Sequence, residues 1–217
     1  LYEDEAVCPF TTPSAVSINT TAKQGIYKWT GNGTLGQTIA HGLGQAPKFI
    51  MVKNAGGSYD WACYHANIDN DLTQAGDYFL RLNTTAARDN NSGYFNDTIT
   101  TDTVITLGSD NPVNHSGNEM IMYAFCDVQG YSKMGSYVGN GNADGPFLYC
   151  GFKPAYIMIK ASSISGNEWN IWDNKRNPSN VAEKVLWANT SNTEAEVAYD
   201  YDIDMLSNGF KAKTADA

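Results

Sequence analysis

Short apolar runs separated by turns rich in glycine and asparagine dominate this sequence. The run 48–53, KFIMVK, has apolar side chains on both faces of an extended strand, which is typical of a central strand covered on both sides. The run 119–125, EMIMYAF, predicts a closing strand, and residues 199–205 alternate apolar side chains with aspartates as a half-exposed strand does. A short helical turn is expected over 181–186. The pattern predicts an all-β protein of short antiparallel strands.

The same succession of segments occurs twice along the chain. Residues 31–53, GNGTLGQTIAHGLGQAPKFIMVK, return as residues 139–160, GNGNADGPFLYCGFKPAYIMIK, and Trp61 then corresponds to Trp169. A spacing of about 107 residues that slips by only one or two positions indicates a duplicated unit. Because this period is the size of a small domain, we expect two tandem β-sandwich units over 24–130 and 131–217, after an N-terminal linker at 1–23.

The second unit stops before a counterpart of 119–125. Without that strand its sheet would have an open edge, which proteins normally cover. A longer chain, another chain or the N-terminal segment is expected to fill this place. The chain also begins with Leu1 rather than methionine, so the sequence predicts a fragment of a larger, multimeric assembly.

Composition narrows the classes of function. The formal net charge is −9, and no basic stripe is present, so we expect no nucleic-acid partner. No apolar run reaches the roughly 20 residues that cross a bilayer, so we expect no membrane insertion. The four cysteines lack metal-ligand spacing and are expected to be buried free thiols, with a disulfide between two of them as the alternative. They are Cys8, Cys63, Cys126 and Cys150.

Candidate catalytic and metal-binding groups do not form a recognisable motif. His41 and His65 lie in the strand-and-turn region of the first unit and could meet in space, but Leu148 and Asp173 stand at the matching positions of the second unit, so a shared site is not duplicated. The aspartates at 200, 202 and 204 lack the glycine and glutamate of a calcium-binding EF-hand loop. No strand carries the carboxylate pair of a glycosidase. We therefore expect no enzyme activity, no metal and no cofactor.

The tryptophans are the natural candidates for sugar binding, because an indole face stacks on the apolar face of a pyranose while nearby polar groups bind its hydroxyls. Trp61 and Trp169 are a duplicated pair, which favours a shared role in the core. Trp172 and Trp187 have no tryptophan counterpart in the first unit, which makes them the better binding candidates, with burial in the core as the alternative. The candidate carbohydrate-binding residues are Trp172, Trp187, Asp173 and Asn174.

Four stretches carry a resemblance to a known family: HGLGQAPKFIMVKN, YAFCDVQGYSKMGSYVGNGNADGPFLYCGFKPAYIMIK, NEWNIWDNKRNP and LSNGFK. Their order resembles that of virion proteins of tailed bacteriophages, especially marine ones, that contain tandem concanavalin-like or SPRY-like β-sandwich units of the jelly-roll type. The resemblance covers about residues 24–213. The resemblance assigns no catalytic residues to this chain. Fold similarity to lectins does not by itself show binding.

The resemblance implies a structural or adhesive part of a virion appendage such as a tail fibre. The expected partners are other virion proteins, further copies of the chain in a homo-oligomer, and host-surface glycan, and the expected location is the virion. The alternative is a secreted bacterial carbohydrate-binding module or a domain associated with a glycoside hydrolase. A virion part would form a stable symmetric oligomer, whereas a secreted enzyme would have converging carboxylates in a cleft.

Overall fold

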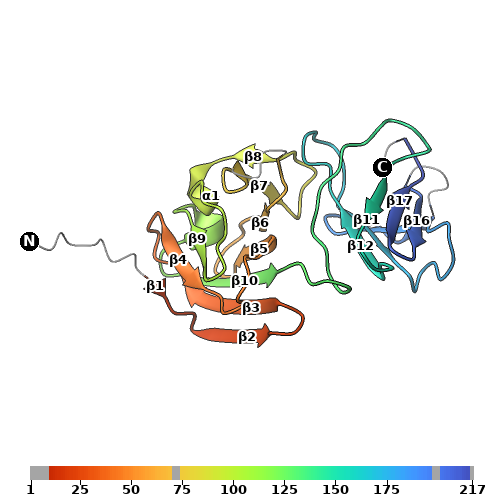
Figure 1. Ribbon diagram of the computed structural model, residues 1–217. Coiled ribbons are helices and arrows are strands. Elements are labelled where there is room, and N and C mark those ends of the chain that lie inside the picture. Colours follow the sequence, from red (N-terminus) through yellow and green to blue (C-terminus); the bar gives the residue numbers. More distant parts are fainter. Residues whose placement is uncertain (1–9, 70–73, 197–200, 216–217) are drawn as a thin grey trace, which may run out of the picture. The chain divides into compact units, whose positions relative to one another are not determined.

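The computed structural model describes residues 10–69, 74–196 and 201–215. These residues form two compact units (Figure 1). The first unit comprises Leu1–Arg81 with Arg88–Asp127, and the second comprises Leu82–Ala87 with Val128–Ala217. The change of unit at Asp127 lies close to the boundary expected from the repeat. The short segment Leu82–Ala87 was not expected to belong to the second unit.

The first unit contains two sheets and two short helices (Figure 1). The larger sheet has seven antiparallel strands in the order β2 (Ala15–Asn19), β3 (Gln24–Thr30), β10 (Glu119–Phe125), β5 (Phe49–Asn54), β6 (Ala62–His65), β7 (Tyr78–Arg81) and β8 (Asp89–Asn90). The smaller sheet has the order β1 (Phe10–Thr11), β4 (Gln37–Ala40) and β9 (Val104–Leu107), with β1 parallel to β4. The helices are α1 (Ser92–Phe95) and α2 (Asn111–Asn114).

Alternation along the strands places the core of the first unit between its two sheets. Along β10, Met120, Met122 and Ala124 are fully buried, whereas the residues between them are only half-buried. Ile39 of β4 and Ile105 of β9 lie opposite each other in the smaller sheet and are also fully buried. Period-two burial on two sheets that share one core is the arrangement of a β-sandwich.

Asn114, at the end of α2, is a fully buried polar residue of the first unit. Its amide donates hydrogen bonds to Asn32 Oδ1 (3.2 Å), Thr34 O (3.0 Å) and Gly108 O (3.0 Å), and its Oδ1 accepts one from the Asn32 N–H (2.9 Å). Both the amide nitrogen and the oxygen of the side chain therefore have partners, and the two N–H groups are shared among three acceptors. These hydrogen bonds hold the Gly-Asn-Gly turn at 31–33 against α2, which explains a buried asparagine in an otherwise apolar layer.

The second unit contains a four-stranded and a three-stranded sheet. The first has the order β12 (Tyr156–Ile159), β13 (Asn170–Asp173), β14 (Lys184–Trp187) and β15 (Ala195–Glu196). The other has the order β11 (Phe147–Tyr149), β17 (Gly209–Ala212) and β16 (Ile203–Leu206). Residues of both sheets, including Ile157, Val185, Ile203 and Phe210, form one buried cluster. The expectation of an all-β protein with antiparallel sheets is therefore confirmed, with the β1–β4 pair as the parallel exception.

The two larger sheets pair their strands in the same register. Phe49 lies opposite His65 in the first unit, and the corresponding residues Tyr156 and Asp173 lie opposite each other in the second. The β6–β7 and β7–β8 pairings recur in the same way as β13–β14 and β14–β15. Equal registers at corresponding sequence positions are what a duplicated unit predicts.

Two expectations from the sequence differ from the structure, and a third falls partly outside the described residues. The N-terminal linker at 1–23 contains the strands β1 and β2, because the backbone of β2 pairs with β3 although its side chains are exposed. The helical turn expected over 181–186 is replaced by β14, where Val185 is fully buried and pairs with Ala195. Tyr199 and Asp200, the start of the expected strand 199–205, lie outside the described residues, and β16 covers its end.

The smaller sheets each place an aliphatic side chain of their middle pairing in the core. Leu148 lies opposite Phe210 and packs against the core of the second unit, as Ile39 lies opposite Ile105 in the first. His41, two residues after Ile39, is fully buried as well, so both side chains lie on the inner face of the first unit.

Candidate functional site

Trp172 lies in the core of the second unit. Its side chain is only 1% exposed, and its indole N–H donates a hydrogen bond to Tyr201 O at 3.0 Å. It lies opposite Ile157, as the equally buried Tyr64 lies opposite Ile50 in the first unit. Neither face of the indole is open to a ligand. The expectation that Trp172 stacks on a sugar is therefore corrected, and its role is packing.

Trp187, at the end of β14, is half-buried at the margin of the same core. Its ring meets Tyr201 edge-on, with ring centroids 6.4 Å apart. Its indole nitrogen is buried and has no hydrogen-bond partner among the described residues. In register it occupies the position that Arg81 has in the first unit. Trp187 is thus the one predicted stacking residue that keeps an accessible surface.

Asp173 and Asn174 shape the turn that follows β13. Asp173 Oδ1 accepts hydrogen bonds from the backbone N–H groups of Lys175 (2.9 Å) and Arg176 (3.0 Å), and Oδ2 lies 2.8 Å from Arg176 Nε. Partial desolvation opposes ionisation of Asp173, but these hydrogen bonds and the Arg176 charge outweigh it and lower the pKa. The backbone N–H of Asn174 donates to Ala155 O at 3.0 Å. Both residues therefore have structural partners.

The two histidines of the first unit have separate structural roles. His41 is fully buried, accepts a hydrogen bond from the Leu43 N–H (3.1 Å) and lies 3.2 Å from Thr101 O. His65 Nδ1 accepts a hydrogen bond from the Asn67 N–H at 3.0 Å. Burial lowers the pKa of both rings, that of His65 to about 4, so both are neutral at pH 7. In the described ranges, no group of three or more metal-ligating side chains converges.

Three cysteines are free thiols, and the fourth, Cys8, lies outside the described residues. Cys63 and Cys126 are buried and Cys150 is half-buried. Cys126 Sγ donates a weak hydrogen bond to Gln45 O at 3.3 Å, and burial raises its pKa to about 11. Burial also raises the pKa of Cys150, and because protonated thiols are poor nucleophiles, Cys126 and Cys150 act as packing groups.

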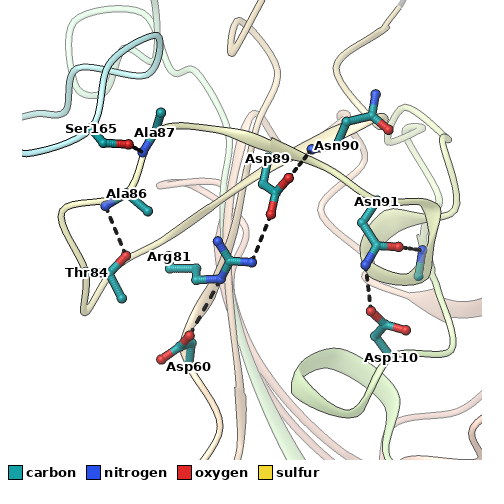
Figure 2. A network of polar contacts seen from close by, with 11 residues as sticks. Asp60, Arg81, Thr84, Ala86, Ala87, Asp89, Asn90, Asn91, Asp110 and Ser165 are labelled. Carbon is teal, nitrogen blue, oxygen red and sulfur yellow. Dashed lines mark hydrogen bonds and ion pairs between the residues drawn. The ribbon is translucent and has the colours of Figure 1, made fainter.

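A polar network surrounds Arg81 at the end of β7 (Figure 2). Its Nε lies 3.6 Å from Asp60 Oδ2, its Nη2 lies 3.1 Å from Asp89 Oδ2, and its guanidinium carbon lies 4.6 Å from the Phe79 ring centroid. Desolvation lowers the pKa of Arg81, but the hydrogen bonds and charges of Asp89 and Tyr94 outweigh it and raise the pKa overall. Both carboxylates therefore form ion pairs with Arg81.

The network continues through Asn91, which caps α1. Asn91 Oδ1 accepts a hydrogen bond from the Gly93 N–H (2.8 Å), and its amide donates one to Asp110 Oδ2 (2.8 Å) (Figure 2). Phe79 and Tyr94 stack beneath these groups, with ring centroids 3.4 Å apart. Together the contacts join β7, β8 and α1. Because Trp187 replaces Arg81 in the second unit, this arrangement is confined to the first.

An aromatic pair lies on the outer face of the seven-stranded sheet. The rings of Trp61 and Tyr123 are 6.2 Å apart between centroids and are inclined by 34°. Tyr123 lies opposite Met51 on one side and Ile26 on the other, and Ile26 is 45% exposed. We call Trp61, Tyr123, Met51 and Ile26 the aromatic strip. Trp61 was interpreted as a core residue, but it is only half-buried and lies outside the core cluster of the first unit.

Charged groups flank the aromatic strip. Lys28 of β3 lies beside it and pairs with Glu119 of β10 at 2.5 Å, with both side chains nearly half exposed. Lys53 Nζ lies on the same face and donates to the carbonyl oxygen of Tyr59 at 2.5 Å. An apolar ring surface with charged hydrogen-bonding groups at its margin is the chemistry that recognises a sugar ring. The sequence missed this site because the strip combines residues of β3, β5 and β10 with Trp61, which precedes β6, and only the strand order of the sheet brings them together.

A hollow of about 180 Å³ is also present in the first unit, lined by Ala46, Pro47, Lys48, Tyr64, Ala66, Asn67, Ile99 and Thr100. It is smaller than the roughly 300 Å³ at which ligand pockets usually begin. Thr100 Oγ1 donates a hydrogen bond to Pro47 O at 2.7 Å across it, which ties the two loops together. The hollow is a packing feature, and the aromatic strip is the better candidate site.

The fold and these sites define an all-β protein of two compact units with a half-buried aromatic pair on one outer sheet face. The chain belongs to the family described as "Domain of unknown function (DUF7483)", whose profile matches residues 9–217. No curated protein and no solved structure matches the chain. In the described part of the chain, no helix is long and apolar enough to cross a membrane. The resemblance to phage appendage proteins stays a prediction.

Proposed function

We propose that this protein is an adhesive and structural module of a bacteriophage virion appendage, such as a tail fibre, that contacts host-surface glycan through the aromatic strip. The observation that carries the proposal is the pair of half-buried rings of Trp61 and Tyr123 on an outer sheet face. Most other large aromatic side chains of the first unit, such as Trp29 and Phe95, are in its core. An aromatic pair left at the surface is therefore the part of this unit best suited to a ligand.

The chemistry of the strip fits a sugar ring. The indole of Trp61 and the phenol of Tyr123 offer apolar faces to the C–H face of a pyranose, and Lys28, Lys53 and Glu119 supply charged groups for its hydroxyls. The formal net charge of −9 disfavours strongly acidic polysaccharides and favours neutral or basic ones. A shallow, open strip implies weak binding at a single site.

Weak sites suit a multimeric appendage. When many copies engage a surface together, each further contact is intramolecular, so the avidity of the particle exceeds the affinity of one site. The order of the four sequence stretches that resemble phage appendage proteins supports this setting. The competing proposal, a secreted bacterial carbohydrate-binding module, uses the same strip but predicts a monomer.

The test is a screen of the 217-residue chain on an array of bacterial surface glycans, followed by calorimetry with the best ligand. Replacing Trp61 or Tyr123 by alanine is expected to weaken binding about three- to tenfold, as the loss of one aromatic contact does. Trp187→Ala is the matched control, because Trp187 is the accessible indole of the second unit. Loss of binding in Trp187→Ala alone, or binding to no glycan, would refute the proposed site. Light scattering separates an oligomeric appendage part from a monomeric module.

A further inference from the structure

Two aromatic side chains lie on the outer face of the three-stranded sheet in the second unit, where β11, β17 and β16 run side by side (Figure 1). Phe147 and Tyr149 of β11 are two positions apart, so both side chains leave the strand on the same face. Phe147 is 46% exposed and Tyr149 is 69% exposed. Leu148, between them, points the other way and packs against the core. The two rings therefore lie on the outer face of a sheet whose inner face is buried.

Gly209 explains why the tyrosine ring is not covered by the neighbouring strand. It lies opposite Tyr149 on β17, so the ring has no cross-strand side chain beside it. A Cβ atom at Gly209 would lie 2.0 Å from the carbonyl oxygen of Leu148 and 3.0 Å from Cζ of Phe147, so a larger residue does not fit without movement. On the far side of Gly209 lies Leu206 of β16, which is half-buried. We call Phe147, Tyr149, Gly209 and Leu206 the aromatic platform.

A charged pair lies at the margin of the platform. Lys211 lies opposite Phe147 on β17, and its ammonium group pairs with the carboxylate of Asp144, whose side chain is 82% exposed. The loop before β11 holds Asp144 in place, because its N–H donates to Asn142 Oδ1 at 2.9 Å and its carbonyl oxygen accepts from the Asn140 amide at 3.1 Å. The hydrogen bond from Lys211, together with its charge, lowers the pKa of Asp144, so the carboxylate stays ionised in mild acid. The margin thus offers both a hydrogen-bond donor and an acceptor.

The size of the platform indicates a small ligand. The exposed parts of its two aromatic side chains together offer roughly 200–300 Å² of apolar surface. Each partner of a stable protein–protein interface buries about 800 Å². The platform is therefore too small to be a complete protein interface, and its area suits one or two rings of a ligand.

The chemistry of the platform indicates a neutral sugar. Aromatic rings stack on the C–H face of a pyranose, and a sugar hydroxyl both donates and accepts, so it can pair with the ammonium of Lys211 as well as with the carboxylate of Asp144. The formal net charge of −9 disfavours nucleic acids, whose bases also stack on aromatic rings. A neutral oligosaccharide is the ligand class that meets both requirements.

The exposure of the platform does not come from a missing strand. β11 pairs with β17 over all three of its residues, and β17 pairs with β16 over all four. Phe147 and Tyr149 project perpendicular to the sheet, so a strand added at its edge would not cover their outer faces. In the first unit the chain after β9 passes through α2, which packs against β5, and enters β10 of the larger sheet. A chain that followed the same course after β17 would leave the platform open.

We propose that the aromatic platform is a second carbohydrate-binding site, which holds a neutral pyranose against Phe147 and Tyr149 while Lys211 and Asp144 bind its hydroxyls. This goes beyond the function proposed for the aromatic strip, because the two sites share no residue and lie in different units. With one site in each unit a single chain is bivalent, so each copy adds two weak contacts to the avidity of an oligomer.

The test is saturation-transfer NMR on the 217-residue chain with four neutral oligosaccharides, namely the hexamers of α-1,4-glucose, β-1,4-glucose, β-1,4-mannose and β-1,4-N-acetylglucosamine. Transfer to the ring protons of at least one of them is expected, and its titration is expected to shift the amide resonances of β11 and β17. Phe147→Ala and Tyr149→Ala are each expected to weaken binding about three- to tenfold, since one aromatic contact is lost. Tyr149→Phe is expected to bind as the unmodified chain does, because the ring makes the contact.

Tyr156→Ala is the matched control, because Tyr156 is 56% exposed but lies on β12 of the other sheet, and it is expected to leave binding unchanged. Binding that persists in Trp61→Ala but is weakened in Tyr149→Ala would support the platform even if the aromatic strip binds nothing. Equal binding in Phe147→Ala, Tyr149→Ala and the unmodified chain, or no transfer to any of the four oligosaccharides, would overturn it, whether or not the strip binds glycan. A dimer that light scattering detects and that Tyr149→Ala dissociates would also overturn it, since the occupant would then be a second copy.

Discussion

Arg176 Nη1 lies 2.5 Å from Glu194 Oε2, and the corresponding pair in the first unit has the opposite charges. There Arg88, which precedes β8 as Glu194 precedes β15, lies 3.2 Å from Asp69 Oδ2, and Asp69 lies in the loop after β6 as Arg176 lies in the turn after β13. Each unit thus keeps an ion pair in the same place while the acid and the base have exchanged positions. A compensated exchange of this kind is expected when two duplicated units retain a contact but not the residues that make it.

Reversing the charge of Arg176 alone is expected to destabilise the second unit. Arg176→Glu would place a third carboxylate beside Asp173 and Glu194, and because these side chains are partly exposed and solvent screens their charges, a small loss in unfolding free energy is expected. The double variant Arg176→Glu with Glu194→Arg should recover part of that loss, as a double-mutant cycle in urea would show. Equal stability of the single and double variants would mean that the pair contributes nothing.

Acid is expected to destabilise the protein through His65. Its pKa is about 4 in the folded chain against about 6.5 when unfolded, so the unfolded chain binds the proton more tightly. The stability that neutral His65 provides is complete above about pH 6.5 and is lost as the pH falls from 6.5 towards 4. At pH 5 the loss is about 2 kcal/mol, and His41, whose pKa is also lowered, adds to it.

The control for this pH effect is His65→Gln, whose side-chain oxygen can still accept the Asn67 N–H but does not titrate. Subtracting its urea-derived stability from that of the unmodified chain at each pH isolates the contribution of His65 from that of the carboxylates. A difference that does not change between pH 7 and pH 5 would contradict the buried neutral histidine.

Removing Arg81 is expected to cost more than removing either of its acidic partners. Arg81→Ala leaves Asp60 and Asp89 without their cation and uncovers Phe79, so a loss of about 1–3 kcal/mol is expected in denaturant unfolding. Asp60→Asn is the matched control, because its contact is the longer one at 3.6 Å, and it should cost under about 1 kcal/mol. Similar losses in the two variants would show that Arg81 acts mainly through the Asp60 pair.

Trp172 is expected to act on stability rather than on ligand binding. Trp172→Ala removes the largest buried side chain of the second unit and should cost about 3–5 kcal/mol, measured by circular dichroism in urea. Trp172→Phe keeps most of the apolar volume and should cost much less. Undiminished stability in Trp172→Ala would show that the indole is not part of a packed core.

The strands that could be predicted from sequence are those whose apolar side chains indicate that they are buried. The runs that become β5 and β10 are apolar enough to be recognised without any partner. By contrast, every residue of β2 is exposed, so only its hydrogen bonds to β3, which the turn at 20–23 brings beside it, make it a strand. In β14, lysine and leucine favour a helix by their local propensity. The segment is nevertheless a strand, because a strand buries Val185 between the two sheets.

The inward or outward direction of the tryptophans could not be predicted for a related reason. Trp172 and its neighbour Ile171 are both apolar, so the sequence of β13 does not show which of them faces the core. The pairing of Trp172 with the buried Ile157 shows that Trp172 is the residue that faces the core. Trp61 and Tyr123 meet only because β5 lies between β6 and β10, a strand order that no local pattern contains.

The buried amide of Asn114 also decides how this protein can be produced. Asn114-His115-Ser116 is an acceptor sequence for N-linked glycosylation, and cells that carry out this modification attach the glycan to secreted chains. In the folded chain the amide nitrogen of Asn114 is fully enclosed and donates to Asn32, Thr34 and Gly108. An oligosaccharide linked to that nitrogen would prevent α2 from closing on the turn. Expression in the bacterial cytoplasm leaves the amide free to form these bonds, whereas secretion from yeast or insect cells is expected to yield misfolded material.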